Sequence, residues 1–407
     1  VAGGPRRAGA AAHPSLGRLM SWARDETKLD RVRALMAEAE LDALVVRAPD
    51  NVLYLTNFWG MKGYDACVFP REGEPVLITI EASEEDAAHT AWTEDVRLIR
   101  GYDPEDPRPP VARTLDAAVA AARDYERVGL ELSLGTQASD RMVGEPTTFT
   151  AAWFDAFPEA ADATPVLVRA RSLKTEQEVE RLRLANEIAA AAMKHVRGQL
   201  RPGMKEAEAA ALWQGFVHGQ GTGWNGGEVE LALPFSLVWA GRGIKTFTAT
   251  GDLPVVEGEP VLFEIWVCAD GYWADHTKNV VLSPLRKDYA ELEAALMSVY
   301  EWALQHIRPG ASMAELDRGV RERIAAMGYP GQPTHPVCHG VGARAHEPPY
   351  PHQAGGGEFA EGMVLAVEPG AYWPGGGGLR VEDNFLVTRD GIEKLSSFPD
   401  GVVQCPT

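Results

Sequence analysis

The sequence contains few cysteines, and no two of them lie close together. Its 407 residues hold four, Cys67, Cys268, Cys338 and Cys405, and they form no Cys-x-x-Cys pair. Such sparse thiols exclude a disulfide framework and a cysteine-rich zinc site. Long apolar runs are also missing, because no segment approaches the roughly 20 residues of a membrane-spanning helix. The sequence therefore predicts a protein with no disulfide scaffold and no membrane partner.

Basic residues are also scarce. Lys and Arg number 39 against 58 Asp and Glu, which gives a formal net charge of −19. Such a balance repels nucleic-acid phosphates and anionic lipids, because both partners require clustered cations. With 45% hydrophobic and 24% charged residues, the composition is that of a folded chain and not of a disordered one. We expect a cytoplasmic protein that does not bind nucleic acid.

The pattern along the chain predicts a short extension and two domains. Residues 1–22 contain an arginine pair and an alanine run that a proline soon interrupts, so we expect a disordered extension with no role in export. Helical and strand patterns alternate over residues 23–168, which predicts an α/β domain with a largely parallel or mixed sheet. This domain shows no ligand cluster, and we expect its role to be structural or oligomeric. Thr175 and Glu178 form a capping-box pattern at the start of a long helix, and we begin the second domain, residues 169–407, just before it.

The second domain carries signs of internal duplication. Arg201-Pro202-Gly203 and Arg308-Pro309-Gly310 lie 107 residues apart, and each follows a predicted long helix and precedes another helix. Strand patterns then follow both helix pairs. Two copies predict an α+β unit whose halves pack face to face, because an open repeat array needs at least three copies.

A two-residue turn in the first copy brings two carboxylates to one side of a hairpin. Asp270-Gly271 lies between β-rich segments, and pairing across this turn places Glu264 opposite Thr277. Asp275 lies two residues before Thr277 and therefore on the same face. An edge hairpin with solvated acids on its outer face is the alternative interpretation of this segment.

The second copy repeats this arrangement with Glu368 and Glu382. We expect these acids on two paired strands, with Arg380 on the same face as Glu382. The offsets from Glu264 to Glu368 and from Asp275 to Glu382 are 104 and 107 residues, which match the spacing of the repeat. Four acids in duplicate register within apolar strands indicate a functional set.

Histidines cluster between the two hairpins. Four of the ten in the chain fall within eighteen residues, at His335, His339, His346 and His352. One imidazole and four carboxylates can hold a pair of divalent ions, which would activate a water molecule and polarise a carbonyl. The remaining histidines would then be available as proton donors or substrate ligands.

These residues resemble the motifs of a known enzyme group. The order of the acids and His339, together with HGVGARAHEPP, AVEPGAYWPG and RVEDN, is similar to that of the creatinase, prolidase and aminopeptidase P metallopeptidases. The resemblance covers most of the chain. It implies an α/β N-terminal creatinase-like domain followed by an α+β catalytic domain with the internally duplicated pita-bread fold.

The resemblance also implies roles for the site residues. The ligands of two divalent ions, usually manganese with cobalt or zinc as alternatives, would be Glu264, Asp275, His339, Glu368 and Glu382. Among these, Glu382 would bridge the ions and Glu368 would orient or deprotonate the attacking water. His335 and His346 would contact substrate and steady the tetrahedral intermediate, and Arg380 would help to order the site. The group also implies a homodimer.

Three residues depart from the pattern of that group. Glu264 stands where the group has its first ligand Asp, Phe247 stands where its peptidases usually offer a His, and Lys278 replaces an Arg. The longer Glu264 side chain displaces its carboxylate and weakens the expectation of two equally held ions.

We predict a metal-dependent hydrolase that cleaves an amide or other C–N bond through a metal-bound hydroxide, as Xaa-Pro peptidases do. One alternative is a creatinase-like hydrolase or lyase for a small N-substituted amino acid or betaine-like substrate. An aromatic pocket for such a cation would come from Trp239, Trp266, Trp273 and Trp373 unless these residues belong to the core. The other alternative is a non-catalytic binding protein on the same fold.

Overall fold

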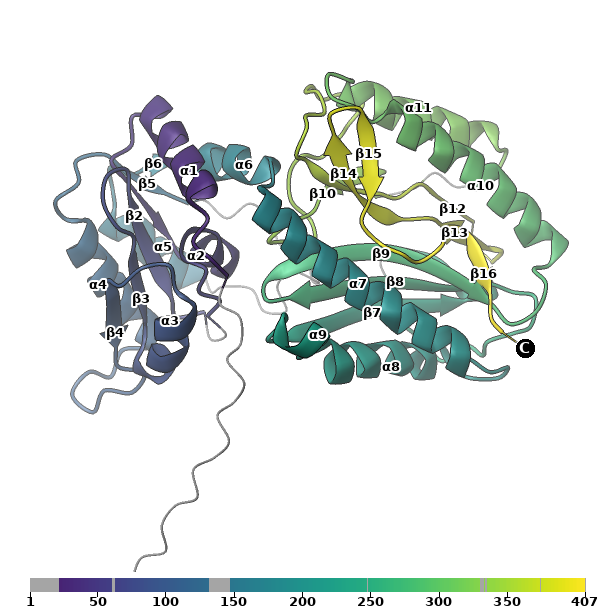
Figure 1. The fold of residues 1–407 in the computed structure, drawn as a ribbon, viewed down its shortest axis with the longest axis horizontal. Coiled ribbons are helices and arrows are strands. Elements are labelled where there is room, and N and C mark those ends of the chain that lie inside the picture. The colour runs from purple at the N-terminus through teal and green to yellow at the C-terminus, as the bar shows by residue number, and fades with distance from the viewer. Residues whose placement is uncertain are drawn as a thin grey trace, which may run out of the picture.

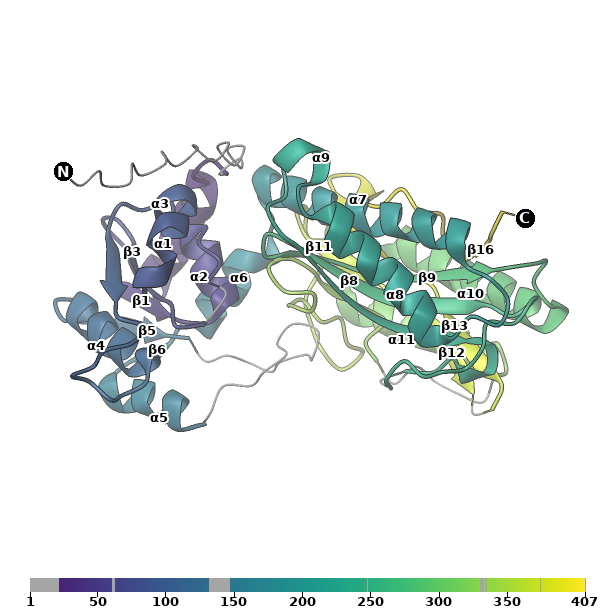
Figure 2. The same ribbon diagram turned by 90° about the horizontal axis from the view of Figure 1, so that it is seen from below.

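The structure is a computed structural model that describes residues 22–60, 63–131, 147–246, 248–329, 333, 335–373 and 375–406. Two α/β bodies lie side by side in it, and both views show them joined through α6 and α7 (Figures 1 and 2). Apart from Trp22, the extension expected over residues 1–22 lies outside the described residues. Among the helices of the described ranges, none has the length and apolarity needed to cross a membrane.

The N-terminal body is a mixed six-stranded sheet in the order β4-β3-β2-β1-β5-β6. The central strand β1 pairs antiparallel with β2 and parallel with β5. Its strands are β1 (Ala43–Val46), β2 (Ala66–Pro70), β3 (Val76–Ile80), β4 (Val96–Ile99), β5 (Val128–Leu130) and β6 (Ala161–Asp162). Strands β1, β2 and β3 are buried along their whole length, which explains their continuous apolar runs. The predicted α/β domain with a mixed sheet is confirmed.

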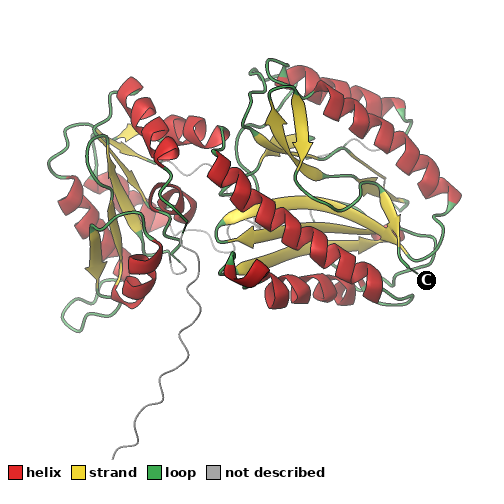
Figure 3. Ribbon diagram, viewed as in Figure 1, coloured by secondary structure: helices red, strands yellow, loops and turns green. Residues whose placement is uncertain are grey.

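Helices cover both faces of this sheet (Figure 3). They are α1 (Glu26–Glu38), α2 (Pro49–Thr56), α3 (Glu84–Thr90), α4 (Pro110–Ala122), α5 (Thr147–Ala156) and α6 (Thr164–Ser172). Helices α1, α2 and α6 share one apolar cluster with the sheet, and α4 and α5 share the cluster on the other side. Helix α6 packs on α1 and crosses the boundary that we place between residues 168 and 169, and that boundary stays a prediction.

The C-terminal body contains three sheets and five helices within the described residues. The helices are α7 (Glu176–Gln199), α8 (Glu206–Phe216), α9 (Trp224–Gly227), α10 (Lys287–His306) and α11 (Met313–Ala326). The first sheet has the order β16-β9-β8-β7, with β7 (Ala232–Ala240), β8 (Val261–Ala269), β9 (Tyr272–Val281) and β16 (Val402–Gln404). The second has the order β10-β11-β14-β15, with β10 (Cys338–Gly340), β11 (Val364–Val367), β14 (Asp383–Thr388) and β15 (Gly391–Lys394). The third pairs β12 (Gly370–Trp373) with β13 (Gly377–Arg380).

The two halves of this body repeat each other in detail. Gly203 and Gly310, which end the two Arg-Pro-Gly triplets, have φ values of 79° and 80°. Each donates its N–H to a backbone carbonyl at 2.9 Å, on Val255 and Phe359 respectively. Helices α7 and α8 lie outside one sheet, and α10 and α11 lie outside the other (Figures 1 and 3). The predicted duplicated unit with facing halves is therefore confirmed.

The long helix α7 begins with the predicted capping box. The Glu178 N–H donates to the Thr175 hydroxyl, and the Thr175 N–H donates in return to the Glu178 carboxylate.

The strand positions expected for Glu368 and Glu382 need a correction. Strand β11 ends at Val367 and β14 begins at Asp383, so both acids lie just beyond paired strands. Pro369 follows Glu368 and offers no N–H to a partner strand, which interrupts the ladder there. The break nevertheless leaves the two acids opposite each other, because Val367 pairs with Asp383 on one side and Gly370 with Arg380 on the other.

Candidate metal centre

The hairpin of β8 and β9 has the predicted register. Glu264 pairs with Thr277, and Trp266 pairs with Asp275. Asp270 and Gly271 both have positive φ, at 46° and 84°, as a tight two-residue hairpin turn requires. The Asp275 N–H donates to Asn384 Oδ1 at 3.0 Å, and Asn384 Nδ2 donates back to the Asp275 carbonyl at 2.8 Å. This pair of bonds joins the two facing sheets at the position of Asp275.

His339 on β10 directs one ring nitrogen at the acids. Its Nδ1 lies 3.0 Å from the Gly340 carbonyl, so Nδ1 carries the proton and Nε2 has a free lone pair. Nε2 lies 3.5 Å from Asp275 Oδ2 and 3.4 Å from Glu368 Oε1. Burial and then the neighbouring His346 lower the pKa of His339 to about 4, so the ring is neutral near pH 7. A neutral imidazole facing two carboxylates is a metal-ligand arrangement.

Several buried atoms at this point lack hydrogen-bond partners among the described residues. Asp275 Oδ2 and His339 Nε2 are two of them, and both residues are at most 1% exposed. Leaving a carboxylate oxygen and an imidazole nitrogen unsatisfied in the interior costs free energy unless a cation lies between them. Two groups bring their donor atoms within 4.8 Å of one another: Asp275, His339 and His346, and His339, Glu368 and Glu382. The residues therefore fit a divalent transition-metal ion.

Crowding of the carboxylates changes their proton affinity. Burial, then Glu382, Glu368 and Glu264, raise the pKa of Asp275 well above its usual value. Burial and then Glu368 raise the pKa of Glu382 to about 8. Burial alone would also raise the pKa of Glu368, but the facing His335 outweighs it and lowers that pKa to about 2. A bound cation would relieve the repulsion between these carboxylates, which is one cause of the raised pKa values of Asp275 and Glu382.

The carboxylate of Glu264 has a different partner. Its Oε2 lies 2.6 Å from Nη2 of Arg380, and neither of the two groups in the described structure includes it. Arg380 Nε donates to Thr277 Oγ1 at 2.5 Å, and that hydroxyl donates to Glu382 Oε2 at 2.6 Å. Arg380 therefore stands between Glu264 and Glu382.

Two further predicted histidines lie beside the acids. His335 Nδ1 is 3.1 Å from Glu368 Oε2, and its Nε2 is 3.2 Å from the Tyr372 hydroxyl. His346 Nε2 is 3.3 Å from Asp275 Oδ2, and its ring centroid is 4.5 Å from that of His339. The clustered His352 is exposed instead, and its Nδ1 accepts from the Ala354 N–H.

The sequence analysis missed a set of buried contacts between β9 and the segment that carries Glu382. Lys278 Nζ donates to the Glu382 carbonyl at 3.0 Å and pairs with Asp383. Asp383 is fully buried and also accepts from Ser396 Oγ at 2.6 Å. The signal was present in the apolar strand that contains Lys278, since a buried lysine requires an acidic partner.

The tryptophans are divided between core and site. Trp239 and Trp266 are 2% and 3% exposed, so both are core residues. Trp266 also approaches the site, with its ring centroid 6.2 Å from that of His346, whereas Trp373 stacks on Tyr329 at 4.9 Å. Phe247 lies outside the described residues.

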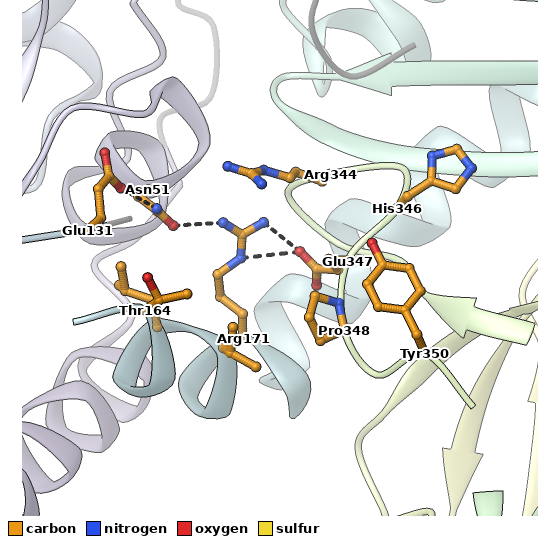
Figure 4. Close-up of a pocket in the computed structure, with 11 residues that line it drawn as sticks. Asn51, Glu131, Thr164, Arg171, Arg344, His346, Glu347, Pro348 and Tyr350 are labelled. Atoms are coloured by element: carbon orange, nitrogen blue, oxygen red, sulfur yellow. Dashed lines mark hydrogen bonds and ion pairs between the residues drawn. The ribbon is translucent and has the colours of Figure 1, made fainter. Parts of the chain in front are cut away.

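A cavity of about 200 Å³ adjoins His346 between the two bodies (Figure 4). Its lining residues are Asn51, Glu131, Thr164, Leu167, Val168, Arg171, Arg344, His346, Glu347, Pro348 and Tyr350. In Figure 4, Arg171 of α6 reaches between Asn51 of α2 and Glu347 of the loop after β10. The N-terminal body therefore forms one wall of a cavity that His346 borders from the other side.

Buried ion pairs fix this loop to the N-terminal body. Glu347 Oε2 lies 2.5 Å from Arg171 Nη2, and its Oε1 lies 2.8 Å from Lys174 Nζ. Asp50 pairs with Arg171 and with Arg344 Nε, the latter at 2.5 Å. Because Glu347 directly follows His346, the network restrains the backbone that carries this histidine.

Comparisons with known proteins agree with this architecture. The family model for metallopeptidase family M24 matches residues 180–389, and the model for the creatinase/prolidase N-terminal domain matches residues 28–173. An uncharacterized peptidase of Bacillus subtilis, YqhT, is 24% identical over 382 residues, covering 92% of this chain and 99% of the relative. The putative dipeptidase YkvY of the same organism has the same identity and coverage.

Solved structures share the whole fold. The prolidase from Pyrococcus horikoshii OT3 has a TM-score of 0.75 at 23% identity, covering 92% of this chain and 99% of its own. The Xaa-Pro dipeptidase from Bacillus anthracis has a TM-score of 0.76 at 22% identity, covering 93% and 99%.

Proposed function

The chain belongs to metallopeptidase family M24, and we propose that it is an Xaa-Pro peptidase that hydrolyses the amide bond before a proline. The observation that carries the proposal is the convergence of buried, unpartnered Asp275 Oδ2 and His339 Nε2 with Glu368 and Glu382. This donor set suits a hydrolytic metal centre, and His335 and His346 beside it supply groups that can contact a substrate.

We propose two divalent ions as cofactors, with manganese first and cobalt or zinc as alternatives. Bound there, such ions would lower the pKa of a water molecule and polarise the carbonyl under attack. The residues that would hold them are Asp275, His339, Glu368 and Glu382, with Glu264 as the fifth ligand and fourth carboxylate.

The side chains around the centre divide the remaining work. His335, 3.1 Å from Glu368 Oε2, lowers the pKa of Glu368 and keeps this carboxylate ionised. We assign to Glu368 the transfer of a proton from the attacking water to the leaving nitrogen. His346, 3.3 Å from Asp275, is placed to donate to the oxygen that gains negative charge. Arg380 and Thr277 orient the Glu382 carboxylate.

The cavity beside His346 supports a short substrate. Its volume of about 200 Å³ is small, and Leu167, Val168 and Pro348 give it apolar walls. Such a cavity suits one small apolar residue next to the bond that is cleaved. We also propose that the protein is cytoplasmic and forms a homodimer. Light scattering on the purified chain would test the dimer.

The test compares substrates and metals together. Protein stripped of metal and reloaded separately with manganese, cobalt or zinc is assayed on Xaa-Pro dipeptides and on small N-substituted amino acids. We expect metal-dependent release of proline. Hydrolysis confined to the N-substituted amino acids would favour the creatinase-like alternative, and inactivity on both sets with every metal would favour a binding protein.

Glu382→Gln provides the matching variant. We expect it to lose metal binding and activity, because Gln keeps the size of the side chain but not its charge. Glu322→Gln makes the same change at an exposed position of α11 and should leave both unchanged. Full activity in Glu382→Gln would refute the assignment of the centre.

A further inference from the structure

Helix α11 carries an ion pair that faces the segment before β10. Asp317 is 0% exposed, and its Oδ1 accepts from Arg321 Nε at 2.9 Å. Arg321 Nη1 donates to the Pro333 carbonyl and Nη2 donates to the His335 carbonyl, both at 3.1 Å. We propose that Arg321, oriented by Asp317, is a positioning residue that holds His335 beside the candidate metal centre. The proposal rests on the substrate contact given to His335 in the proposed function, and it adds the residue that places this histidine.

The segment before β10 needs hydrogen-bond donors from outside a strand ladder. Pro333 and Pro336 have no N–H to donate, and β10 begins only at Cys338. His335 is 5% exposed, so water has little access to its backbone. A buried carbonyl requires a donor, and Arg321 supplies two donors to this segment from one planar guanidinium.

The ion pair is itself held in one orientation. Each of the three guanidinium nitrogens of Arg321 donates to a different acceptor, so turning the group would break at least one bond. Asp317 Oδ2 accepts the Gln353 N–H at 2.9 Å, which fixes the carboxylate from the other side. Since His335 precedes β10 and Gln353 follows it, the pair joins the chain on both sides of this strand.

The backbone position of His335 decides whether its ring reaches the site. His335 Nδ1 lies 3.1 Å from Glu368 Oε2, and Nε2 lies 3.2 Å from the Tyr372 hydroxyl. A displacement of the His335 backbone by about 1 Å would take both contacts beyond hydrogen-bond distance. Misplacement on that scale can lower a rate about 100-fold, even when the mutated residue lies away from the chemistry.

The first half of the domain has different residues at the equivalent positions. At the repeat spacing of 107 residues, the counterparts of Asp317 and Arg321 are Ala210 and Gln214 on α8. Gln214 Nε2 donates to Ser236 Oγ on β7 at 2.8 Å, so a neutral side chain contacts a regular strand there. The charged pair occurs in the half whose proline-flanked segment carries a histidine of the site.

The first experiment is a double-mutant cycle on the manganese-loaded full chain. Arg321→Met and His335→Ala are compared alone and together on the preferred Xaa-Pro dipeptide. Arg321→Met should lower kcat/KM by about tenfold to 100-fold. If Arg321 acts through His335, its replacement should cause no further loss in the His335→Ala background. Losses that multiply in the double variant would overturn the proposal.

The second experiment requires no activity. Histidine ring signals of the metal-free, isotope-labelled chain are recorded by NMR, and the signal that His335→Ala removes belongs to His335. This signal should shift in Arg321→Met. It should stay in place in the matched control Arg318→Met, because Arg318 is exposed on the same helix and donates to the Gln353 carbonyl at 3.3 Å. An unshifted His335 signal in Arg321→Met would overturn the positioning role.

A second variant keeps both experiments decisive. Arg321→Met leaves Asp317 buried without its cation and can prevent folding, whereas Asp317→Asn combined with Arg321→Met removes both charges and takes its place in that case. A shifted His335 signal in a protein that releases no proline would keep the positioning role and overturn the proposed function. Proline release with multiplying losses would do the reverse.

Discussion

The loop that carries His346 depends on a buried carboxylate, and Glu347→Gln tests this dependence. Glu347 is 3% exposed, and its two oxygens face Arg171 and the 1% exposed Lys174. Removing one member of a buried ion network costs about 3–5 kcal/mol, because the remaining charges lose their partner. Arg171 keeps Asp50 and Asn51, and Lys174 keeps the Arg171 carbonyl at 2.9 Å. We therefore expect the low end of that range, about 3 kcal/mol.

Two measurements check this expectation. Chemical unfolding gives the loss of stability, and steady-state kinetics on the preferred substrate should show a lower kcat, since His346 loses its restraint. Glu322→Gln is the exposed control. A double-mutant cycle with Arg171→Met should give a loss well below the sum of the single losses, because both variants break the same ion pair. A loss under about 1 kcal/mol, or additive losses, would refute the assignment of Glu347 to this network.

The network also predicts acid sensitivity. Burial alone would raise the pKa of Glu347, but Lys174 and Arg171 outweigh it and lower that pKa below the ordinary 4.5. A carboxylate with a depressed folded pKa stabilises the protein fully above its unfolded pKa, and the contribution is lost as pH falls through the folded value. Unfolding midpoints of the wild type should therefore drop below about pH 4.5 more steeply than those of Glu347→Gln.

Two other predictions concern buried charges. Burial and the neighbouring acids raise the pKa of Asp275, so the ionised form of this residue destabilises the metal-free protein. Asp275→Asn should therefore raise the melting temperature of the metal-free protein by an amount equivalent to at least about 1 kcal/mol. The same variant should lose the thermal stabilisation that added manganese gives to the wild type. Thermal melts with and without manganese check both parts, and a lower metal-free melting temperature would contradict the first. Burial lowers the pKa of Lys28 to about 8 from 10.5, so the unfolded chain binds more protons between these values and stability should rise with pH there. Lys28→Met should flatten that rise in unfolding experiments from pH 8 to 10.5, and an unchanged slope would exclude Lys28 as its source.

Local sequence signals predicted much of the centre. Asp270-Gly271 fixes a two-residue turn, so the pairing of Glu264 with Thr277 follows by counting along the strands. The duplicated spacing then places Glu368 and Glu382 in the equivalent positions of the second half. The hairpin prediction succeeds because it depends on a few neighbouring residues and on the regular geometry of a strand. The strand positions expected for Glu368 and Glu382 were wrong, because both acids lie just beyond the paired strands.

Contacts between distant segments could not be predicted in this way. The ion pair of Glu264 with Arg380 joins two different sheets. Arg171 and Glu347 are 176 residues apart, and the sequence around either residue does not predict their contact. Pro369 is a different case, because a proline at that place already argues against a continuous strand.

The N-terminal body takes part in the site more closely than its composition indicates. Its acids and amides are scattered in sequence, but folding gathers Asp50, Asn51 and Glu131 at the start of α2, where the Glu131 carboxylate accepts the Arg47 N–H at 2.7 Å. There Asp50 forms ion pairs with Arg171 and Arg344. Arg171 in turn forms an ion pair with Glu347, the residue after His346. A domain in which the sequence shows no ligand cluster therefore restrains a histidine at the candidate metal centre. Loss of kcat in Arg171→Met with unchanged binding of manganese would separate this positioning role from metal binding itself.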